Sequence, residues 1–277
     1  MRPLRVVTIN IWNRQGPWEH RLRLLQKGIA ELNPDVIGLQ EVIHRPRGSR
    51  STCQACVLAD AWTEAGGPRD LFVSFGPAFT YENGDQFGNA IISRFPLHQD
   101  QTFPLPGTDA RSVHFARVET HAGLLPFFVT HLSWKFEEGY LREGQVLGIA
   151  DTLDAVLREG DLPAVLVGDL NAAPDTTEMR FLQGKHALDG RSIHFTDAFE
   201  RAGEGPGFTF DPPKNPHAAL TWEAPRRIDY VLTQGPDDSG RGLPLTAKVV
   251  LDEVVETDHG RIAPSDHYGV LAELRMG

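Results

Sequence analysis

Polar side chains with catalytic potential follow several apolar runs of this chain, each at the point where the run ends. Carboxylates, carboxamides and histidines are the groups that a hard divalent cation and a general acid and base require. Their placement after strand-like segments predicts metal-dependent hydrolysis. The motifs are Asn10, Gln40-Glu41, Thr130-His131, Gly168-Asp169-Leu170-Asn171, Arg227-Ile228-Asp229-Tyr230 and Ser265-Asp266-His267.

Two parts of the chain repeat the order strand, helix, strand, and both carry polar motifs at their strand ends. Strands joined by a helical crossover are expected to be parallel, so their carboxyl ends lie at one edge of a sheet. The polar residues can therefore converge. The expected strand, helix and strand cover residues 4–9, 18–32 and 36–39 in the first unit, and residues 125–129, about 140–157 and 164–167 in the second.

Further strand-like segments are too numerous for a single sheet. With the two repeated units they favour an α/β sandwich of two sheets, each covered by helices on one side. Six more strands are expected at residues 71–75, 90–93, 113–119, 227–232, 247–251 and 268–274.

Long segments rich in proline and glycine separate these elements and are expected to be loops. Loops of such length in a compact domain are usually functional or mobile, which suits substrate selection around a fixed metal centre. They cover residues 44–70, 95–109, 203–219 and 234–243.

Length and composition limit the protein's class. The 277 residues, 40% of them hydrophobic, can bury one substantial core, and no linker divides them, so we expect a single domain over residues 1–277. A formal charge of −10 argues against a nonspecific duplex-binding surface, which needs many basic side chains. It does not exclude a nucleic-acid substrate.

The chain shows neither a signal peptide nor the roughly 18 consecutive apolar residues of a membrane span. We therefore expect a cytoplasmic monomer that does not bind membranes. Cys53 and Cys56 form a Cys-x-x-Cys pair without an evident second pair of zinc ligands. Two incidental thiols at the start of a helix are the favoured interpretation, with a redox pair as the alternative.

Taken together, the six motifs resemble the endonuclease/exonuclease/phosphatase superfamily. This superfamily of metal-dependent hydrolases includes pancreatic-type deoxyribonucleases, exonuclease III-type repair enzymes, neutral sphingomyelinases and inositol polyphosphate 5-phosphatases. One motif alone occurs by chance, but six in this order over residues 8–270 are specific. The resemblance implies a four-layer αββα sandwich of two mixed β-sheets, as in the pancreatic-type deoxyribonucleases, and Mg²⁺ or Mn²⁺ as cofactor.

The resemblance also implies a role for each motif residue, in an in-line attack of a metal-organised water on phosphorus. The resemblance assigns the metal environment to Asn10, Glu41 and Asp266. It implies that Asp169 positions or deprotonates the water and that Asn171 holds a phosphate oxygen or the water. It also implies that His131 and His267 contact the scissile phosphate, with His267 paired to Asp229, and that Asn89 faces the same pocket.

Other side chains leave alternatives open. Arg111 precedes an expected strand and is either a clamp for a substrate phosphate or an ordinary surface arginine. The aromatic residues Phe208, Phe210 and Trp222 either stack on a base or cover an acyl group, or they pack in the core or a lid. Trp134 is a candidate for the rim of the site.

Two departures from the family pattern restrict the substrate. Ile43 stands where pancreatic-type nucleases have a basic residue for the DNA minor groove, and no carboxylate that would support His131 is evident. We therefore expect a phosphodiesterase or phosphatase acting on a small or single-stranded phosphate ester. A repair-type DNA endonuclease or exonuclease is the alternative, and a non-catalytic scaffold is a weaker one because all six motifs are intact.

Overall fold

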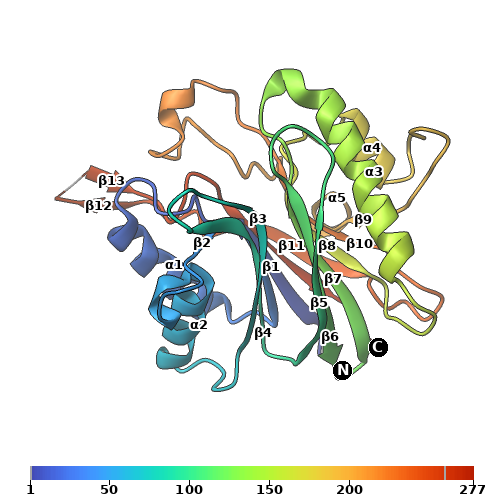
Figure 1. The fold of residues 1–277 in the computed structure, drawn as a ribbon, viewed down its shortest axis with the longest axis horizontal. Helices are drawn as coiled ribbons and strands as arrows, with labels where there is room; N and C mark the ends of the chain where they lie inside the picture. Colours follow the sequence, from blue (N-terminus) through green and yellow to red (C-terminus); the bar gives the residue numbers. More distant parts are fainter. Residues whose placement is uncertain (1, 259) are drawn as a thin grey trace.

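The structure, a computed structural model, describes residues 2–258 and 260–277. They contain two six-stranded sheets packed face to face and a separate sheet of two short strands, β12 and β13 (Figure 1). The strands are β1 (Leu4–Asn10), β2 (Val36–His44), β3 (Phe72–Thr80), β4 (Gln86–Ser93), β5 (Leu97–Pro104), β6 (Ser112–Thr120), β7 (Gly123–His131), β8 (Val165–Asp169), β9 (Thr196–Asp197), β10 (Asp229–Thr233), β11 (Pro244–Val250), β12 (Val255–Thr257), β13 (Gly260–Ile262) and β14 (Gly269–Leu274). The helices are α1 (Trp18–Leu32), α2 (Gln54–Glu64), α3 (Gly139–Val156), α4 (Thr177–Leu182) and α5 (Ala198–Ala202), with 3-10 helices η1 (Arg50–Thr52), η2 (Phe136–Glu138) and η3 (Ala219–Thr221).

Helices cover the outer face of each sheet, and the two inner faces share a core. The first sheet has the order β11-β14-β1-β2-β4-β3, and the second the order β5-β6-β7-β8-β10-β9. In the outer layers, Leu25 and Trp62 of α1 and α2 pack in one apolar cluster with the first sheet, while Ile149 and Phe181 of α3 and α4 pack in another with the second. This four-layer αββα arrangement confirms the expected fold (Figure 1).

Both repeated units have the expected parallel strands. β1 and β2 pair in parallel with Asn10 opposite Gln40, and β7 and β8 pair in parallel with His131 opposite Asp169. β10 then runs antiparallel beside β8 and places Asp229 opposite Asp169. The polar ends of three neighbouring strands therefore form one row across the second sheet.

Two of the expected loops contain regular structure. Residues 44–70 include η1 and the whole of α2, whose buried side chains Ala55, Leu58, Ala59 and Trp62 recur at helical spacing. Residues 95–109 include β5, an edge strand whose polar and mostly exposed sequence lacks the apolar alternation of a half-buried strand. The prediction of loops was wrong for both segments.

The cysteine pair lies at the start of a helix, as expected. Cys53 is the N-terminal cap of α2, and its thiol accepts a hydrogen bond from the backbone nitrogen of Cys56 at 3.4 Å. Both thiols are free. Within residues 2–258 and 260–277, none of the helices has the length and apolar character needed to cross a bilayer.

Candidate active site

An open cavity of about 550 Å³ lies at the carboxyl ends of β1, β7 and β8 and beside the amino ends of the antiparallel strands β10 and β14. Every predicted site residue except Asn89 and Asp229 contributes to its wall. The predicted residues that line it are Asn10, Glu41, Arg111, His131, Asp169, Asn171, Asp266 and His267. Residues separated by more than 250 positions in the sequence therefore meet in one place, which we call the active-site cavity.

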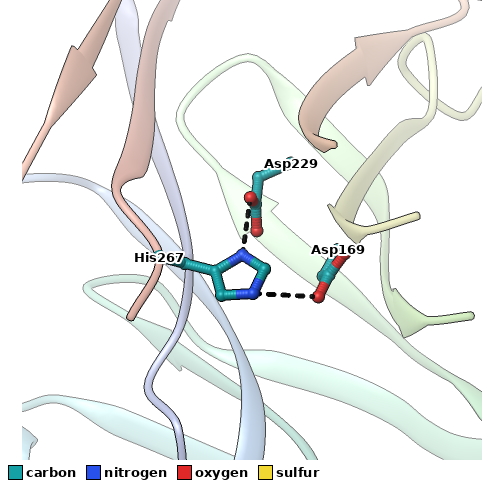
Figure 2. Close-up of side chains that lie close together, drawn as sticks. All are labelled: Asp169, Asp229 and His267. Carbon is teal, nitrogen blue, oxygen red and sulfur yellow. Dashed lines mark hydrogen bonds and ion pairs between the residues drawn. The ribbon is translucent and has the colours of Figure 1, made fainter. Parts of the chain in front are cut away.

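His267 lines this cavity and stands between two carboxylates (Figure 2). Its Nδ1 lies 2.9 Å from Oδ2 of Asp229, and its Nε2 lies 3.7 Å from Oδ2 of Asp169. Burial alone would lower the pKa of His267, but the charges of Asp229 and Asp169 raise it well above its ordinary value. The imidazole is thus held as an imidazolium, and Asp229, behind the cavity wall, fixes its orientation.

The pKa of Asp169 is shifted as well. Burial raises the pKa of Asp169 to about 7; His267 opposes this shift and Asp229 adds to it. Its other contacts orient the carboxylate, because Oδ2 accepts a hydrogen bond from Asn10 Nδ2 at 3.1 Å and Oδ1 accepts one from the backbone nitrogen of Asn171 at 3.0 Å. A carboxylate with these properties can accept a proton near neutral pH.

The backbone around Asp169 and Glu41 is constrained. At Gly168, φ is +154° and an added Cβ would stand 2.0 Å from the carbonyl oxygen of Thr130 on the neighbouring strand. Glu41 and Asn171 adopt positive φ values of 58° and 49°, which are unusual for side chains other than glycine. Such backbone strain concentrates at functional sites, and here it aims two predicted site residues into the cavity.

The carboxylates predicted to hold a metal, those of Glu41 and Asp266, line the same cavity. Glu41 accepts hydrogen bonds from Asn10 Nδ2 at 3.3 Å and from Asn13 Nδ2 at 2.8 Å. Burial raises the pKa of Asp266 to about 6; His267 opposes this shift and the charge of Glu41 adds to it. Two partly desolvated carboxylates that repel each other favour a divalent cation near them, so these oxygen donors fit Mg²⁺ or Mn²⁺.

A second arrangement of ligand atoms was not predicted as a metal site. Among the described residues, ligand atoms of Asp169, Asp229 and His267 lie within 4.8 Å of one another. Both ring nitrogens of His267 face carboxylates, which suits a protonated imidazole better than a metal-bound one. Asn10 also differs from a simple ligand, because its amide nitrogen donates to Glu41 and Asp169 while its oxygen accepts from the backbone nitrogen of Trp12.

His131 is the neutral counterpart of His267. Its Nε2 lies 3.4 Å from Oδ2 of Asp169, and within residues 2–258 and 260–277 its buried Nδ1 has no hydrogen-bond partner. Burial, followed by the charges of Arg111 and His267, lowers the pKa of His131 well below its ordinary value. The sequence offered no carboxylate to support this histidine, and in the part of the chain that the structure describes none lies at Nδ1. A neutral imidazole still carries one N–H that can donate to a phosphoryl oxygen.

Arg111 is part of a chain of hydrogen bonds rather than an ordinary surface arginine. Its side chain is only 10% exposed, and its Nε donates to Asp109 Oδ2 at 3.0 Å. The other oxygen of Asp109 accepts from Ser133 Oγ at 2.7 Å, and Ser133 Oγ accepts from Gln145 Nε2 on α3 at the same distance. The guanidinium is thereby held in the cavity wall near His131.

Asn89 and Asp229 stand outside the cavity wall. Asp229 acts through His267, as described above. Asn89 on β4 is buried, and its amide nitrogen donates to the carbonyl oxygen of Ser112 at 3.1 Å, which links the two sheets. The expectation that Asn89 faces the pocket is therefore not met by the geometry.

Arg21 supports the site from behind, although no motif includes it. The side chain is fully buried and donates to the carbonyl oxygens of Ile11 at 2.9 Å and Pro264 at 3.0 Å. It also donates to the carbonyls of three residues after β1, which are Trp12, Asn13 and Gln15. An arginine on the apolar face of an expected helix, between Trp18 and Leu25, was the signal that could have identified it.

Comparisons with known proteins place the chain among relatives with this fold. Nocturnin from Xenopus laevis is 24% identical over 275 residues; the match covers 93% of this chain, and the chain spans about 64% of the length of that relative. An endonuclease/exonuclease/phosphatase from Beutenbergia cavernae superposes with a TM-score of 0.71 at 25% identity, covering all of this chain and 72% of that one. D. rerio TDP2 in complex with single-strand DNA product gives a TM-score of 0.74 at 19% identity, with 98% of each chain covered.

The family match covers most of the chain and includes every motif on which the cavity depends. The model of the Endonuclease/Exonuclease/phosphatase family matches residues 7–267. That range begins within β1 and ends at His267. The chain therefore belongs to the Endonuclease/Exonuclease/phosphatase family.

Proposed function

We propose that this protein is a Mg²⁺- or Mn²⁺-dependent phosphodiesterase or phosphatase acting on a small or single-stranded phosphate ester. The observation that carries the proposal is the row of acid and base groups around His267, with the carboxylates of Glu41 and Asp266 in the same cavity. The likeness to a zebrafish protein solved with single-strand DNA product supports single-stranded nucleic acid among the candidate substrates.

The chain's own residues suit attack of water on phosphorus. Asp169 takes a proton from the attacking water, and His267, charged and held by Asp229, stabilises the developing charge on a phosphoryl oxygen. His131 and Asn171 donate to the remaining oxygens. A divalent cation held by Glu41 and Asp266, with Asn10 beside them, would neutralise phosphate charge and organise the water.

A panel of phosphate esters tests this proposal. The substrates are bis(p-nitrophenyl) phosphate, p-nitrophenyl phosphate, a single-stranded oligonucleotide, and plasmid and abasic-site DNA, each with Mg²⁺, Mn²⁺ or EDTA. We expect metal-dependent turnover of at least one small ester or of the single-stranded oligonucleotide. Selective cleavage of abasic-site DNA would favour the repair nuclease instead, and no turnover of any substrate by folded protein would favour a non-catalytic scaffold.

A histidine pair provides the matched control for this panel. His267→Gln should lower kcat by about a hundredfold or more, because the charge facing the phosphate is lost. His98→Gln removes an exposed histidine that pairs with Glu119 on the distant strands β5 and β6 and should retain wild-type turnover. Wild-type turnover in His267→Gln would contradict the proposed chemistry.

A further inference from the structure

One wall of the active-site cavity contains an arginine that the motifs do not include. Arg226 lines the cavity, and its guanidinium carbon lies 4.7 Å from the ring centre of Phe136 and 5.4 Å from that of Phe210. Backbone hydrogen bonds between Phe210 and Arg226 fix the two residues side by side. Both ring faces attract a cation, so the guanidinium is held in the wall instead of extending into water.

The hydrogen-bonding capacity of this guanidinium is largely unused. Its Nη2 donates to Glu223, which is also a cavity residue, and its buried Nε has no hydrogen-bond partner among the described residues. The side chain is 19% exposed. A guanidinium offers five donors in a planar fork that matches a phosphate group, and a partly buried one with spare donors favours an anion.

Arg226 and Arg111 serve different parts of the cavity. The charge of Arg111 contributes to lowering the pKa of His131, so Arg111 belongs to the His131 side. Arg226 belongs to the His267 side, because both residues neighbour Phe210, whose ring centre lies 5.1 Å from that of His267 and 5.4 Å from the guanidinium carbon of Arg226. Among the described residues, the side chain of Arg226 contacts Glu223, Phe136 and Phe210 and not His267, so the anion that it would meet is a different group from the phosphate that contacts His267.

Exposed aromatic rings adjoin this wall. Trp134 lines the cavity and is 61% exposed, and Phe136, which contacts Arg226, is 66% exposed. A planar base can stack on such rings. The cavity thus presents a stacking surface beside an anion-binding group.

We propose that Arg226 binds a second, nonscissile phosphate, so that the preferred substrate is a nucleotide carrying a phosphate next to the one that is hydrolysed. This inference rests on the proposed phosphoester hydrolysis and specifies its substrate class. Glu223 occupies Nη2 of Arg226 when no such phosphate is bound, and its negative charge opposes binding of the phosphate. Arg226 and Glu223 therefore have opposite effects on substrate choice.

Three chromogenic esters test the proposal by varying only the second phosphate. They are thymidine 5′-(p-nitrophenyl phosphate) with a free 3′-hydroxyl, with a 3′-phosphate, and with a 3′-(methyl phosphate). The last two distinguish a terminal phosphate from the internal phosphodiester of an oligonucleotide. For wild-type protein, kcat/KM should be about tenfold or more higher for at least one phosphorylated ester than for the 3′-hydroxyl ester. The difference should lie mainly in KM, because a hydrogen bond between charged groups increases affinity by about this factor.

Variants of the two residues should shift this preference in opposite directions. Arg226→Gln should bring the kcat/KM of the preferred phosphorylated ester close to that of the 3′-hydroxyl ester. Arg226→Lys should retain part of the preference for the phosphorylated ester, and Glu223→Gln should increase this preference. Arg241→Gln, which alters an arginine paired with Asp237 away from the cavity, is the matched control. An equal loss for all three esters in Arg226→Gln would show a merely structural role and overturn the proposal.

A binding measurement separates this inference from the proposed activity. Calorimetric titration compares thymidine 3′,5′-bisphosphate with thymidine 5′-phosphate in wild-type protein and in Arg226→Gln. We expect tighter binding of the bisphosphate that depends on Arg226, even if none of the esters is hydrolysed. Equal affinity of wild-type protein for the two ligands would overturn the inference, whereas discrimination without hydrolysis would contradict only the proposed activity.

Discussion

At the scale of single residues, the charges in the active-site cavity depend on partners that stand behind them. Asp229 does not line the cavity, yet it fixes the imidazole of His267 through a 2.9 Å contact to Nδ1. Arg21 likewise contributes no atom to the cavity wall, but it joins the segment after β1 to Pro264, which precedes the Ser265-Asp266-His267 motif. Both residues act by positioning others.

Asp229→Asn should lower kcat strongly while leaving the fold intact. The amide can still hold the imidazole ring but no longer supplies the charge that raises the pKa of His267. A loss of about 10² to 10⁴ in kcat is expected from comparable carboxylate–histidine pairs. Steady-state kinetics with a chromogenic diester measures it, and a loss of less than threefold would count against the assigned role of the pair.

Arg21→Met should destabilise the protein and weaken metal binding together. The change removes a buried guanidinium and leaves several carbonyl oxygens unpaired, at a cost of about 3 kcal/mol in the free energy of unfolding. Urea unfolding and calorimetric titration with Mn²⁺ would measure the two effects. Arg23→Met, an exposed position on the same helix, serves as control. Equal stability of the two variants would contradict the role given to Arg21.

Much of the site could be predicted at this scale, because each motif residue is joined to a strand end that the sequence also reveals. The exceptions depend on contacts between distant segments. Asn89 has the residue type and position of a site residue, but its amide is used between the sheets. Arg226 precedes the Arg227-Ile228-Asp229-Tyr230 motif with no signal of its own, because Phe136 and Phe210 surround it only after folding.

At the scale of elements, the end of β8 determines where the chemistry takes place. β8 lies between β7 and β10, so Asp169 is paired with His131 on one side and with Asp229 on the other. Gly168 permits the close approach of β8 to β7 at this point. The parallel strands and their crossover helices were predictable from periodicity, whereas β5 was not, because an exposed edge strand needs no apolar pattern.

The Gly168→Ala substitution adds only one methyl group but should lower activity strongly. The new Cβ would stand 2.0 Å from the carbonyl oxygen of Thr130, so β8 must move and carry Asp169 with it. We expect a destabilisation of about 1–3 kcal/mol and a loss of at least tenfold in kcat. Gly144→Ala inside α3 meets only Pro106 at 4.0 Å; it should leave kcat unchanged and stabilise the helix by up to about 1 kcal/mol. Wild-type kcat in Gly168→Ala would show that this strand position is not critical.

At the scale of the whole molecule, the interface between the sheets carries a polar contact as well as the apolar core. His114 on β6 is fully buried; its Nε2 lies 2.6 Å from Ser74 Oγ on the first sheet, and its Nδ1 lies 3.0 Å from Thr102 Oγ1 on β5. Burial lowers the pKa of His114, and the charge of Asp100 opposes the shift. The folded protein therefore keeps this imidazole neutral under conditions in which the unfolded chain protonates it.

His114→Gln should reduce the acid sensitivity of folding. Because the pKa of His114 is lower in the folded state, its contribution to stability is complete above the unfolded value of about 6.5 and is lost as pH falls below it. One such group changes the free energy of unfolding by at most about 1.4 kcal/mol per pH unit. Urea unfolding at pH 7.5 and 5.5 should therefore give a smaller difference for the variant. An unchanged difference would contradict the prediction, and His98→Gln is the control.

The two-sheet arrangement was predictable because strand count, crossovers and motif order all agree with one fold. Cytoplasmic location and monomeric state stay predictions from the sequence.

The position of the cation within the assembled cavity is the feature on which the proposed chemistry depends most, because it decides which carboxylates bind metal and which transfer protons.

Anomalous diffraction from crystals grown with Mn²⁺ would locate that cation directly. We predict one peak within coordination distance of Glu41 and Asp266, with His267 still hydrogen-bonded to Asp229. A peak between Asp169, Asp229 and His267 alone, or none at saturating Mn²⁺, would contradict the account.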